Sequence, residues 1–355
     1  MRDLVVAGAG MAGLTAAAEA RRLGARPLVL EKLDRAGGSM RLSSGVVWRH
    51  RDLARMRSEC PGGDELLQRL LFERLDRDLR WLEELGAPVL ARDTGNPLTT
   101  GVRFEPEGLT SALVRAAGEV RVSTPLTGAP ERDTPLVLAT GGFGASRELL
   151  REHVTPEADH VFLRLAPGST GDGLRLGLAA GGEKSDGMDE VYARAMPAPP
   201  ARAGPAELVR LSQLYARHAE VTNERGERYE ARTWSETDVA QWMCRQPRAR
   251  AIFRVSTANL RARVRDRTVA EMIDAAEAAG APVRRHGKHV SVETVAGVTT
   301  TLGGLRIDGQ TRVARDLFAC GADAGGIATG GYLSGLAAAL VFGRIAARAA
   351  LGEEP

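Results

Sequence analysis

The sequence feature that most constrains the fold is a glycine motif near the start of the chain. Gly8, Gly10 and Gly13 have the spacing G-x-G-x-x-G, and they follow an apolar run at residues 4–7 that is typical of a buried strand. The alanine-rich residues 16–23 come next and combine high helix propensity with one apolar face. The chain is therefore predicted to begin with a strand, a tight turn and a helix.

This turn has the chemistry of a dinucleotide site. Gly8 permits a tight turn, Gly10 lets backbone approach a pyrophosphate, and Gly13 lets the helix pack closely on the strand. The phosphates would lie on unpaired N–H groups at the helix N-terminus. Residues 28–30 predict a second strand, and Glu31 at its end is placed to accept hydrogen bonds from ribose hydroxyls. The motif alone does not distinguish NAD from FAD.

Composition excludes several other classes of protein. The 355 residues suffice for one large or two moderate domains, and the net charge of +3 is spread over arginines interspersed with acids, which argues against a nucleic-acid partner. Cys60, Cys244 and Cys320 lie far apart and the six histidines have no metal spacing, so we expect neither a zinc site nor a redox disulfide. No apolar run is long enough for a transmembrane helix and no signal peptide is expected, so we predict a cytoplasmic protein without membrane contact.

Further glycine-rich turns recur along the chain. Gly37-Gly38 opens a loop of small hydroxyl residues, the strand-like residues 135–139 end in Thr-Gly-Gly, and residues 168–173 (GSTGDG) open a helix. Near the end, two more strand–glycine units precede an apolar helix at 336–350. Each turn can bring backbone N–H groups close to a ligand.

The middle of the chain has a different sequence pattern. Helices are expected within 51–87 and at 109–117, with a short strand at 120–122. From about residue 183 a proline-rich stretch leads into mixed-charge helical segments such as 268–279. We predict an α/β protein in which a Rossmann-like cofactor domain (1–184 and 298–355) carries an inserted, mainly α capping domain (185–297).

Taken in order, these pieces resemble the flavoprotein superfamily of FAD-dependent fumarate reductases, succinate dehydrogenases and 3-ketosteroid dehydrogenases. The matching pieces are GAGMAGLTAA, VLEK, AGGSMRLSSG, LVLATGGFG, STGDGLRLGLAAG, NERGERY, TLGGLRID and LFACGADAGG followed by SGLAAALVFGRIA. The resemblance implies that the dinucleotide is FAD. It also implies that the N-terminus of the last helix would stabilise negative charge at the pyrimidine end of the flavin.

The resemblance implies a set of FAD contacts drawn from these turns and the last helix. The set is Gly8, Gly10, Met11, Ala12, Gly13, Glu31, Lys32, Gly38, Ser39, Ser43, Ser44, Gly45, Val120, Thr140, Gly141, Asp172, Asp323, Ser334, Leu336 and Ala337. Asp323 takes the place of a family Glu that faces the ribityl chain. No histidine lies between Gly38 and Val47, where membrane-bound members attach FAD, so we expect non-covalent FAD.

Other departures concern the substrate. Thr299 stands where the dicarboxylate enzymes have a His, about Gly330 where they have a carboxylate-binding Arg, and Glu236 where they have a proton-shuttling Arg. Without bidentate Arg pairing a dicarboxylate would be held poorly, so fumarate and succinate are not expected as substrates.

Candidate catalytic and substrate-binding residues remain. Tyr192, Arg232, Glu236 and Tyr332 are candidate acids or bases, and Trp48, Thr299, Thr300, Thr301 and Thr329 are candidate substrate contacts. Arg232 reads equally well as a solvated surface residue, the threonines as strand formers, and Trp48 as a core residue.

Three functions are compatible with this sequence. The first is an FAD-dependent oxidoreductase for α,β-dehydrogenation, or the reverse ene-reduction, of a small to medium, largely uncharged organic substrate in specialised metabolism. Its electron donor or acceptor cannot be read from the sequence. The second is an FAD-dependent oxidase or hydroxylase that uses oxygen. The third is a flavin-binding subunit whose active site has decayed.

Overall fold

The computed structural model describes residues 3–128, 134–230 and 235–354. The chain divides into two compact units, which are described separately. Unit 1 comprises Met1–Ser146, Leu165–Glu190 and Thr300–Pro355, and unit 2 comprises Arg147–Arg164 and Val191–Thr299. The boundaries expected from the sequence, at 184/185 and 297/298, remain a prediction.

Unit 1 is built on a six-stranded sheet with the order β16-β17-β7-β1-β2-β6. All neighbouring pairs are parallel except the edge pair β16–β17, which is antiparallel. The strands are β1 (Leu4–Ala7), β2 (Pro27–Leu30), β6 (Glu119–Arg121), β7 (Leu136–Leu138), β16 (Arg312–Ala314) and β17 (Leu317–Ala319). The predicted α/β, Rossmann-like architecture is confirmed, and the strands expected at the start of the chain and before Thr-Gly-Gly are present.

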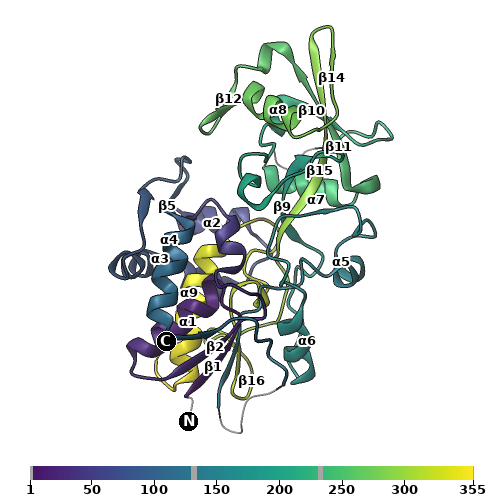
Figure 1. Cartoon of the computed structure of the whole chain (residues 1–355). Coiled ribbons are helices and arrows are strands. Elements are labelled where there is room, and N and C mark those ends of the chain that lie inside the picture. Colours follow the sequence, from purple (N-terminus) through teal and green to yellow (C-terminus); the bar gives the residue numbers. More distant parts are fainter. Residues whose placement is uncertain (1–2, 129–133, 231–234, 355) are drawn as a thin grey trace. The chain divides into compact units, whose positions relative to one another are not determined.

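Helices and a smaller sheet complete unit 1 (Figure 1). The helices are α1 (Met11–Arg22), α2 (Leu53–Glu59), α3 (Glu65–Glu84), α4 (Pro106–Ala117), α6 (Asp172–Ala179) and α9 (Gly335–Ala350), with the short 3-10 helices η1 (Gly38–Leu42) and η6 (Gly321–Asp323). The smaller sheet is antiparallel and has the order β3-β5-β4, with β3 (Val46–His50), β4 (Val89–Ala91) and β5 (Thr99–Phe104).

Small residues let α1 and α9 pack closely together. The residues of α1 from Met11 to Ala20 are all buried, and α1 packs against both α9 and α4. A Cβ placed on Gly343 of α9 would lie only 2.6 Å from the Ala12 carbonyl oxygen of α1. The alanine-rich composition of α1 is therefore a packing requirement, since larger side chains would separate the two helices.

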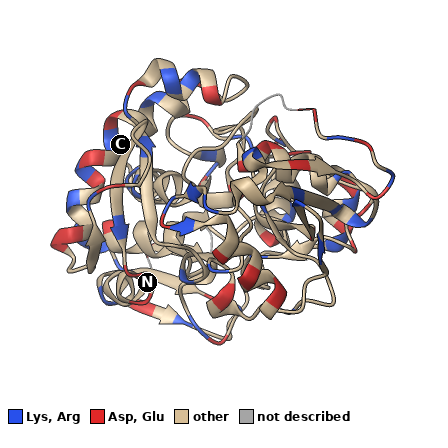
Figure 2. Cartoon of the chain, turned by 90° about the horizontal axis from the view of Figure 1, so that it is seen from above, with Lys and Arg blue, Asp and Glu red and all other residues tan. Residues whose placement is uncertain are grey.

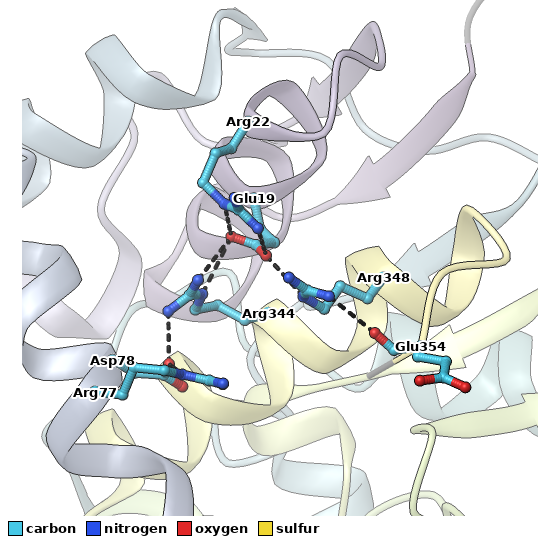
Figure 3. Close-up of polar contacts among 7 residues, drawn as sticks. All are labelled: Glu19, Arg22, Arg77, Asp78, Arg344, Arg348 and Glu354. Carbon is cyan, nitrogen blue, oxygen red and sulfur yellow. Dashed lines mark hydrogen bonds and ion pairs between the residues drawn. The ribbon is translucent and has the colours of Figure 1, made fainter.

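A network of buried charges joins α1, α3 and α9 (Figure 3). Arg344 of α9 donates to Glu19 of α1 at 3.0 Å and to Asp78 of α3 at 2.6 Å, and its guanidinium lies 4.6 Å from the centre of the Trp81 ring. Burial alone would raise the pKa of Glu19, but hydrogen bonds and charges of Arg22 and Arg344 outweigh it and lower the pKa to about 2. Burial raises the pKa of Asp78 despite its arginine neighbours. Glu19 is thus held as a carboxylate in the interior of unit 1.

Unit 2 contains a sheet where the sequence predicted mainly helices. Its strands have the order β10-β11-β15-β14, and β8 and β9 also pair with the long strand β15. The strands of this sheet are β8 (Phe162–Leu163), β9 (Val191–Pro197), β10 (Ala219–Thr222), β11 (Arg250–Ser256), β14 (Val283–His286) and β15 (His289–Thr301). β12 (Arg263–Val264) and β13 (Arg267–Thr268) form a separate antiparallel pair. The helices are α5 (Arg147–His153), α7 (Glu236–Cys244) and α8 (Val269–Ala278), with 3-10 helices η2 (Pro205–Glu207), η3 (Ala216–His218), η4 (Pro247–Ala249) and η5 (Thr257–Asn259).

The expectation of a mainly α inserted domain was therefore wrong in its balance of elements. In β11, buried and more exposed residues alternate along Arg250–Ser256, and this period of two is the signature of a half-buried strand. Charged residues at the alternate positions made the segment look like a polar helical region. The helix expected at 268–279 is present as α8, capped by Thr268.

Surface charges of both signs are interspersed along the elements of both units (Figure 2). In the described part of the chain, no group of His, Cys, Asp and Glu side chains is placed to hold a metal ion. Among the described helices, none combines the length and apolarity needed to cross a membrane.

Candidate FAD site

The candidate site lies at the carboxyl ends of the parallel strands of unit 1. The glycine turn follows β1, Glu31 follows β2, Thr140 follows β7, and η6 follows β17. In open parallel sheets this edge is where ligands bind, because the loops that leave the strands converge there.

The three glycines of the first turn have distinct environments. Gly8 has a φ of +105°, and a Cβ there would lie 2.2 Å from the Ala139 carbonyl oxygen. A Cβ on Gly13 would lie 1.9 Å from the Gly8 carbonyl oxygen, whereas a Cβ on Gly10 would meet nothing within 4 Å. Gly8 and Gly13 are thus required by the protein's own backbone, and Gly10 faces open space.

The N-terminus of α1 offers unpaired donors beside Gly10. Gly10 is its N-cap residue, and no described side chain caps the helix. The first N–H groups of α1, which include those of Met11 and Ala12, are the groups that a helix cannot pair internally. Together with the helix dipole they form a site suited to a pyrophosphate.

The second glycine loop lies against the first. Gly37 N–H donates to the Ala9 carbonyl at 2.7 Å, and a Cβ on Gly38 would lie 3.4 Å from Gly10 Cα. The Ser39 hydroxyl accepts a hydrogen bond from the Ala166 N–H at 2.9 Å. The loop predicted from AGGS is therefore positioned beside the pyrophosphate turn.

The remaining loop residues brace their own backbone. The Ser43 hydroxyl donates to the Met40 carbonyl at 2.7 Å and accepts from Gly45 N–H at 3.0 Å. Gly45 has a φ of +72°, and a Cβ there would lie 2.0 Å from the Phe104 carbonyl oxygen. The Ser44 carbonyl accepts from the Arg103 side chain.

The acid after β2 is buried and braces the glycine turn. Glu31 is 7% exposed, and its carboxylate accepts hydrogen bonds from Ala9 N–H at 2.8 Å and Leu33 N–H at 2.9 Å. Each carboxylate oxygen has a second lone pair, so these bonds leave Glu31 able to accept from ribose hydroxyls. Val120 lies in the middle of the neighbouring strand β6 and pairs with Val29 of β2.

Lys32 and Asp172 contact each other. The Lys32 ammonium donates to Asp172 at 2.6 Å and to the Thr170 hydroxyl at 2.6 Å. The sequence reasoning assigned both residues to FAD without foreseeing this ion pair, because they are 140 positions apart.

Asp323 has a structural role that the sequence did not indicate. It is 1% exposed, and its carboxylate accepts from Thr140 N–H, from the Thr140 hydroxyl at 3.0 Å and from Gly142 N–H at 3.0 Å. Burial raises the pKa of Asp323, and these hydrogen bonds oppose that effect. Asp323 thereby holds the Thr140-Gly141 turn in place, and a contact with the ribityl chain stays a prediction.

Aromatic residues gather near the start of α9. Tyr332 and Trp48 lie edge to face with ring centres 6.1 Å apart, and Trp48 lies 5.4 Å from His50 in the same way. The Tyr332 hydroxyl accepts from Gly335 N–H at 3.3 Å, and the Ser334 hydroxyl caps the helix by accepting from Ala337 N–H at 3.3 Å. The structure thus brings Tyr332 and Trp48 together beside the helix terminus that the resemblance assigns to the flavin, next to the expected contacts Ser334, Leu336 and Ala337.

The predicted threonines of unit 1 fall into two groups. Thr301 and Thr329 have buried hydroxyls without a hydrogen-bond partner among the described residues. The Thr300 hydroxyl donates to the Thr301 carbonyl at 3.2 Å, which is local to the strand.

Unit 2 brings together predicted and unforeseen residues in a group that we call the arginine cluster. Its members are Tyr192, Arg194, Glu236, Arg164 and Thr299. Arg194 donates from Nε to the Tyr192 hydroxyl at 2.7 Å and from Nη1 to Glu236 at 2.7 Å. Arg164 donates from Nη1 to the Thr299 hydroxyl at 2.9 Å.

Sequence reasoning missed both arginines of this cluster. A signal was present for Arg194, because it is the single charged residue in the apolar strand VYARAMP of β9, where every residue is buried. Arg232, the fourth predicted catalytic residue, lies outside the described residues.

The fold and the site together define the class of protein. A parallel sheet whose carboxyl edge presents an uncapped helix N-terminus, closely packed glycine turns and a buried acid after β2 is a dinucleotide-binding fold. A family model described as FAD binding domain matches residues 3–131 and 53–336, and the chain belongs to this family of flavoproteins. No curated protein matches the sequence.

Solved structures share this fold across nearly the whole chain. An open-conformation flavocytochrome c3 fumarate reductase is 20% identical with a TM-score of 0.71, over 99% of this chain and 78% of that chain. The 3-ketosteroid-delta4-(5alpha)-dehydrogenase from Rhodococcus jostii RHA1, solved with 4-androstene-3,17-dione, is 18% identical with a TM-score of 0.72, over 99% and 96%. The 3-ketosteroid delta1-dehydrogenase from Sterolibacterium denitrificans is 16% identical with a TM-score of 0.72, over 99% of both chains. The resemblance seen in the sequence is confirmed, and FAD is the cofactor.

The residues present fit FAD. The open space at Gly10 and the free N–H groups of α1 suit the pyrophosphate, and Glu31 retains lone pairs for the ribose. The start of α9 lies beside the β3 strand that holds Trp48, since the Ser334 hydroxyl is 3.5 Å from the Val46 carbonyl. A helix N-terminus there would stabilise negative charge on the flavin.

Proposed function

We propose that this protein is an FAD-dependent oxidoreductase that carries out α,β-dehydrogenation, or the reverse ene-reduction, of a small to medium, largely uncharged organic substrate. The observation that carries the proposal is the convergence at one sheet edge of the glycine turns, the uncapped N-terminus of α1 and the buried Glu31. The fold shared with a fumarate reductase and a ketosteroid dehydrogenase supports a reduction or dehydrogenation as the reaction class.

The protein's part in this reaction is to hold the cofactor and manage one proton. Bound FAD supplies a hydride acceptor or donor for one carbon of the substrate. The neighbouring carbon needs an acid or base within hydrogen-bond reach. We assign this role to Tyr332, whose hydroxyl lies at the N-terminus of α9 and accepts from Gly335 N–H. Trp48 beside it supplies an apolar wall.

The proposal of a largely uncharged substrate rests on the same region. Gly330, which stands where the resemblance places a carboxylate-binding Arg, offers only its backbone, and its N–H donates to Glu190 at 2.8 Å. A substrate with two carboxylates would need charged donors at that position.

We also propose that the FAD is bound without a covalent link and that residues 185–297 serve as the substrate-binding capping domain. Cys60, Cys244 and Cys320 are buried and form no disulfide, and burial raises the pKa of the Cys244 thiol to about 12. Buried thiols outside disulfides fit the reducing cytoplasm, where we place the protein.

The proposal is tested first on the cofactor and then on the chemistry. The purified protein should contain FAD close to 1:1, released into the supernatant by acid precipitation. Enones and their saturated counterparts should then change the oxidation state of the flavin under anaerobic conditions. A Tyr332→Phe variant should retain FAD and lose at least about 100-fold in the rate of that change.

The outcomes separate the three candidate functions. Protein without flavin contradicts the whole proposal. Rapid reoxidation by oxygen with peroxide release identifies an oxidase, and flavin that no substrate or nicotinamide reduces identifies a decayed flavin-binding subunit.

A further inference from the structure

Residues 326–331, which we call the α9 loop, lead into the N-terminus of α9. Tyr332, the proposed acid or base, directly follows this loop. Its hydroxyl accepts from Gly335 N–H, and its ring lies edge to face with Trp48. The position of Tyr332 is therefore set on one side by α9 and Trp48, and on the other side by the conformation of the α9 loop.

The connection between α2 and α3 runs along the α9 loop and supplies backbone donors to it. Asp64 N–H donates to the Gly326 carbonyl at 2.8 Å, and Gly62 N–H donates to the Thr329 carbonyl at 3.1 Å. The carbonyl of Ile327 lies between these two positions, and a side chain pairs with it. The loop is thus held to the α2–α3 connection at three of its carbonyls.

The side chain that reaches Ile327 is Gln68 of α3, which is 0% exposed. Its amide nitrogen donates to the Ile327 carbonyl at 2.9 Å and to the Cys60 carbonyl at 2.9 Å. One amide group therefore ties the α9 loop to the start of the α2–α3 connection. Without this amide, two buried backbone acceptors would lose the donor that it supplies, which is costly in the interior of a protein.

Arg57 of α2 fixes which end of the Gln68 amide faces the loop. Arg57 Nη1 donates to Gln68 Oε1 at 3.2 Å and to the Gly63 carbonyl at 2.9 Å. Because a guanidinium can only donate, the amide oxygen must face Arg57 and the amide nitrogen must face the carbonyls. The two hydrogens of that nitrogen match the two carbonyls that it contacts.

Two glycines allow the two segments to lie this close together. A Cβ on Gly63 would clash with the Gln68 amide nitrogen and the Ile327 carbonyl oxygen. A Cβ on Gly331 would clash with the Glu59 carbonyl oxygen. Both the α2–α3 connection and the α9 loop are therefore shaped for this contact.

We infer that Gln68 is a positioning residue for the proposed reaction, because it holds the α9 loop in the conformation that presents the Tyr332 hydroxyl. The inference rests on the proposed function and deepens it, since an acid or base must lie within hydrogen-bond reach of the group that it serves. A displacement of about 1 Å can cost about 100-fold in rate, so the anchoring of this loop sets the rate of the chemical step.

The test uses the FAD-loaded full-length protein labelled with 3-fluorotyrosine. The chain has four tyrosines, and Tyr332→Phe assigns the fluorine NMR resonance of Tyr332 by its loss. Gln68→Met preserves the length of the side chain and removes both donors. It should retain FAD and shift or broaden the Tyr332 resonance. At saturating 2-cyclohexenone, the rate of reoxidation of the reduced flavin should fall about tenfold or more, with the half-saturating concentration unchanged.

Gln213 of unit 2 offers a matched control. It is 1% exposed, and its amide nitrogen donates to the Leu211 carbonyl at 2.7 Å and to the Met272 carbonyl at 3.2 Å. Gln213→Met therefore removes the same pair of buried donors at a place outside unit 1. It should lower the unfolding temperature as Gln68→Met does, and it should leave the Tyr332 resonance unchanged.

Arg57→Met is a milder variant that decides the matter if Gln68→Met does not fold. The Arg57 side chain is 33% exposed, and its removal frees the Gln68 amide to turn, so the Tyr332 resonance should change in the same sense by a smaller amount.

Three results would overturn the inference. They are an unchanged Tyr332 resonance in the Gln68 and Arg57 variants, an equal change in Gln213→Met, and an undiminished rate in variants whose Tyr332 resonance has moved. A wild-type protein whose reduced flavin no enone reoxidises contradicts the proposed function instead. The Tyr332 resonance still decides, without any substrate, whether Gln68 holds the loop.

Discussion

Gly10 differs from Gly8 and Gly13 because no described neighbour would clash with a side chain at its position. Gly8 is fixed by its positive φ and by the Ala139 carbonyl, and Gly13 by the Gly8 carbonyl, whereas Gly10 has an ordinary φ of −82° and open space around it. Neither backbone conformation nor packing among the described residues explains a glycine at position 10. We therefore expect the glycine to make room for a bound ligand, the pyrophosphate of FAD.

Substitution of these glycines should separate folding from cofactor binding. Gly10→Ala should leave the free energy of unfolding of the apoprotein within about 0.5 kcal/mol and weaken FAD at least about tenfold, because its Cβ occupies the approach of the phosphates. Gly8→Ala should cost about 3 kcal/mol or more through strain and clash. Urea unfolding and FAD titration measure the two effects.

Gly24→Ala is the matched control. Gly24 has a φ of +86° with nothing within 4 Å of a Cβ, so the substitution should cost about 1 kcal/mol and leave FAD affinity unchanged. Full FAD affinity in Gly10→Ala would contradict the placement of the pyrophosphate.

His50 is a buried histidine whose ring nitrogens have no partner among the described residues. Burial lowers the pKa of His50 below its ordinary 6.5, and the charges of Glu59, Arg55 and Asp52 modify that effect. His50 therefore binds a proton more weakly in the folded protein than in the unfolded chain, so protonation favours unfolding. The stability associated with neutral His50 is fully present above about pH 6.5 and is lost as the pH falls below that value.

A His50→Phe variant should lose that pH dependence. Phenylalanine keeps the contact with Trp48 and cannot be protonated, so the variant should lose less stability than the wild type between about pH 7 and pH 5. Urea unfolding at each pH measures the difference. His160→Gln, at a side chain that is 52% exposed, is the control and should follow the wild type. Parallel curves for His50→Phe and the wild type would show that His50 does not titrate in this way.

At the scale of the element, buried charges join the helices α1, α3 and α9 of unit 1. Arg344 links α9 to α1 through Glu19 and to α3 through Asp78 (Figure 3). Ion pairs of this kind are not in themselves stabilising, but removing one partner leaves a buried charge. The network therefore specifies how α1, α3 and α9 pack together.

Arg344→Met should lower the free energy of unfolding by about 3–5 kcal/mol, because Glu19 and Asp78 would lose their shared partner in the interior. Arg348→Met should cost about 1 kcal/mol, since Arg348 is 27% exposed and Glu19 would keep Arg344. Urea unfolding of both variants at neutral pH measures the difference. Equal losses of unfolding free energy in the two variants would show that Arg344 contributes no more to stability than Arg348.

At the scale of the whole molecule, the two units contain different groups of candidate functional residues. The groups that suit FAD all belong to unit 1, and the arginine cluster belongs to unit 2. A ligand that binds only the folded form of one unit stabilises that unit by linkage.

Hydrogen exchange should display this division. Addition of FAD to apoprotein should slow amide exchange at 8–13, 140–142 and 321–325 of unit 1, because binding suppresses local opening there. Amides of β10 and β11 in unit 2 should exchange at the same rate with and without FAD. Mass spectrometry of peptic fragments gives both readings. Equal protection of β11 would contradict the assignment of the FAD contacts to unit 1 alone.

The sequence was most informative where chemistry is local. The glycine spacing, the strand before it, the acid after β2 and the apolar helix at 336–350 were all predicted in place, because turns and element periodicity depend on residues a few positions apart. The resemblance then identified FAD.

The tertiary structure alone decided which distant residues meet. It paired Lys32 with Asp172, directed Asp323 onto the Thr140 turn, and replaced the expected mainly α insertion with a sheet. It also placed Arg194 on Tyr192 and Glu236, and Arg164 on Thr299. Such contacts depend on strand register and loop closure over long stretches of chain, and no local pattern encodes them. The sequence by itself therefore determined the Rossmann-like domain and the cofactor, whereas the packing of the folded chain decided the sheet of unit 2 and the polar partners of distant residues.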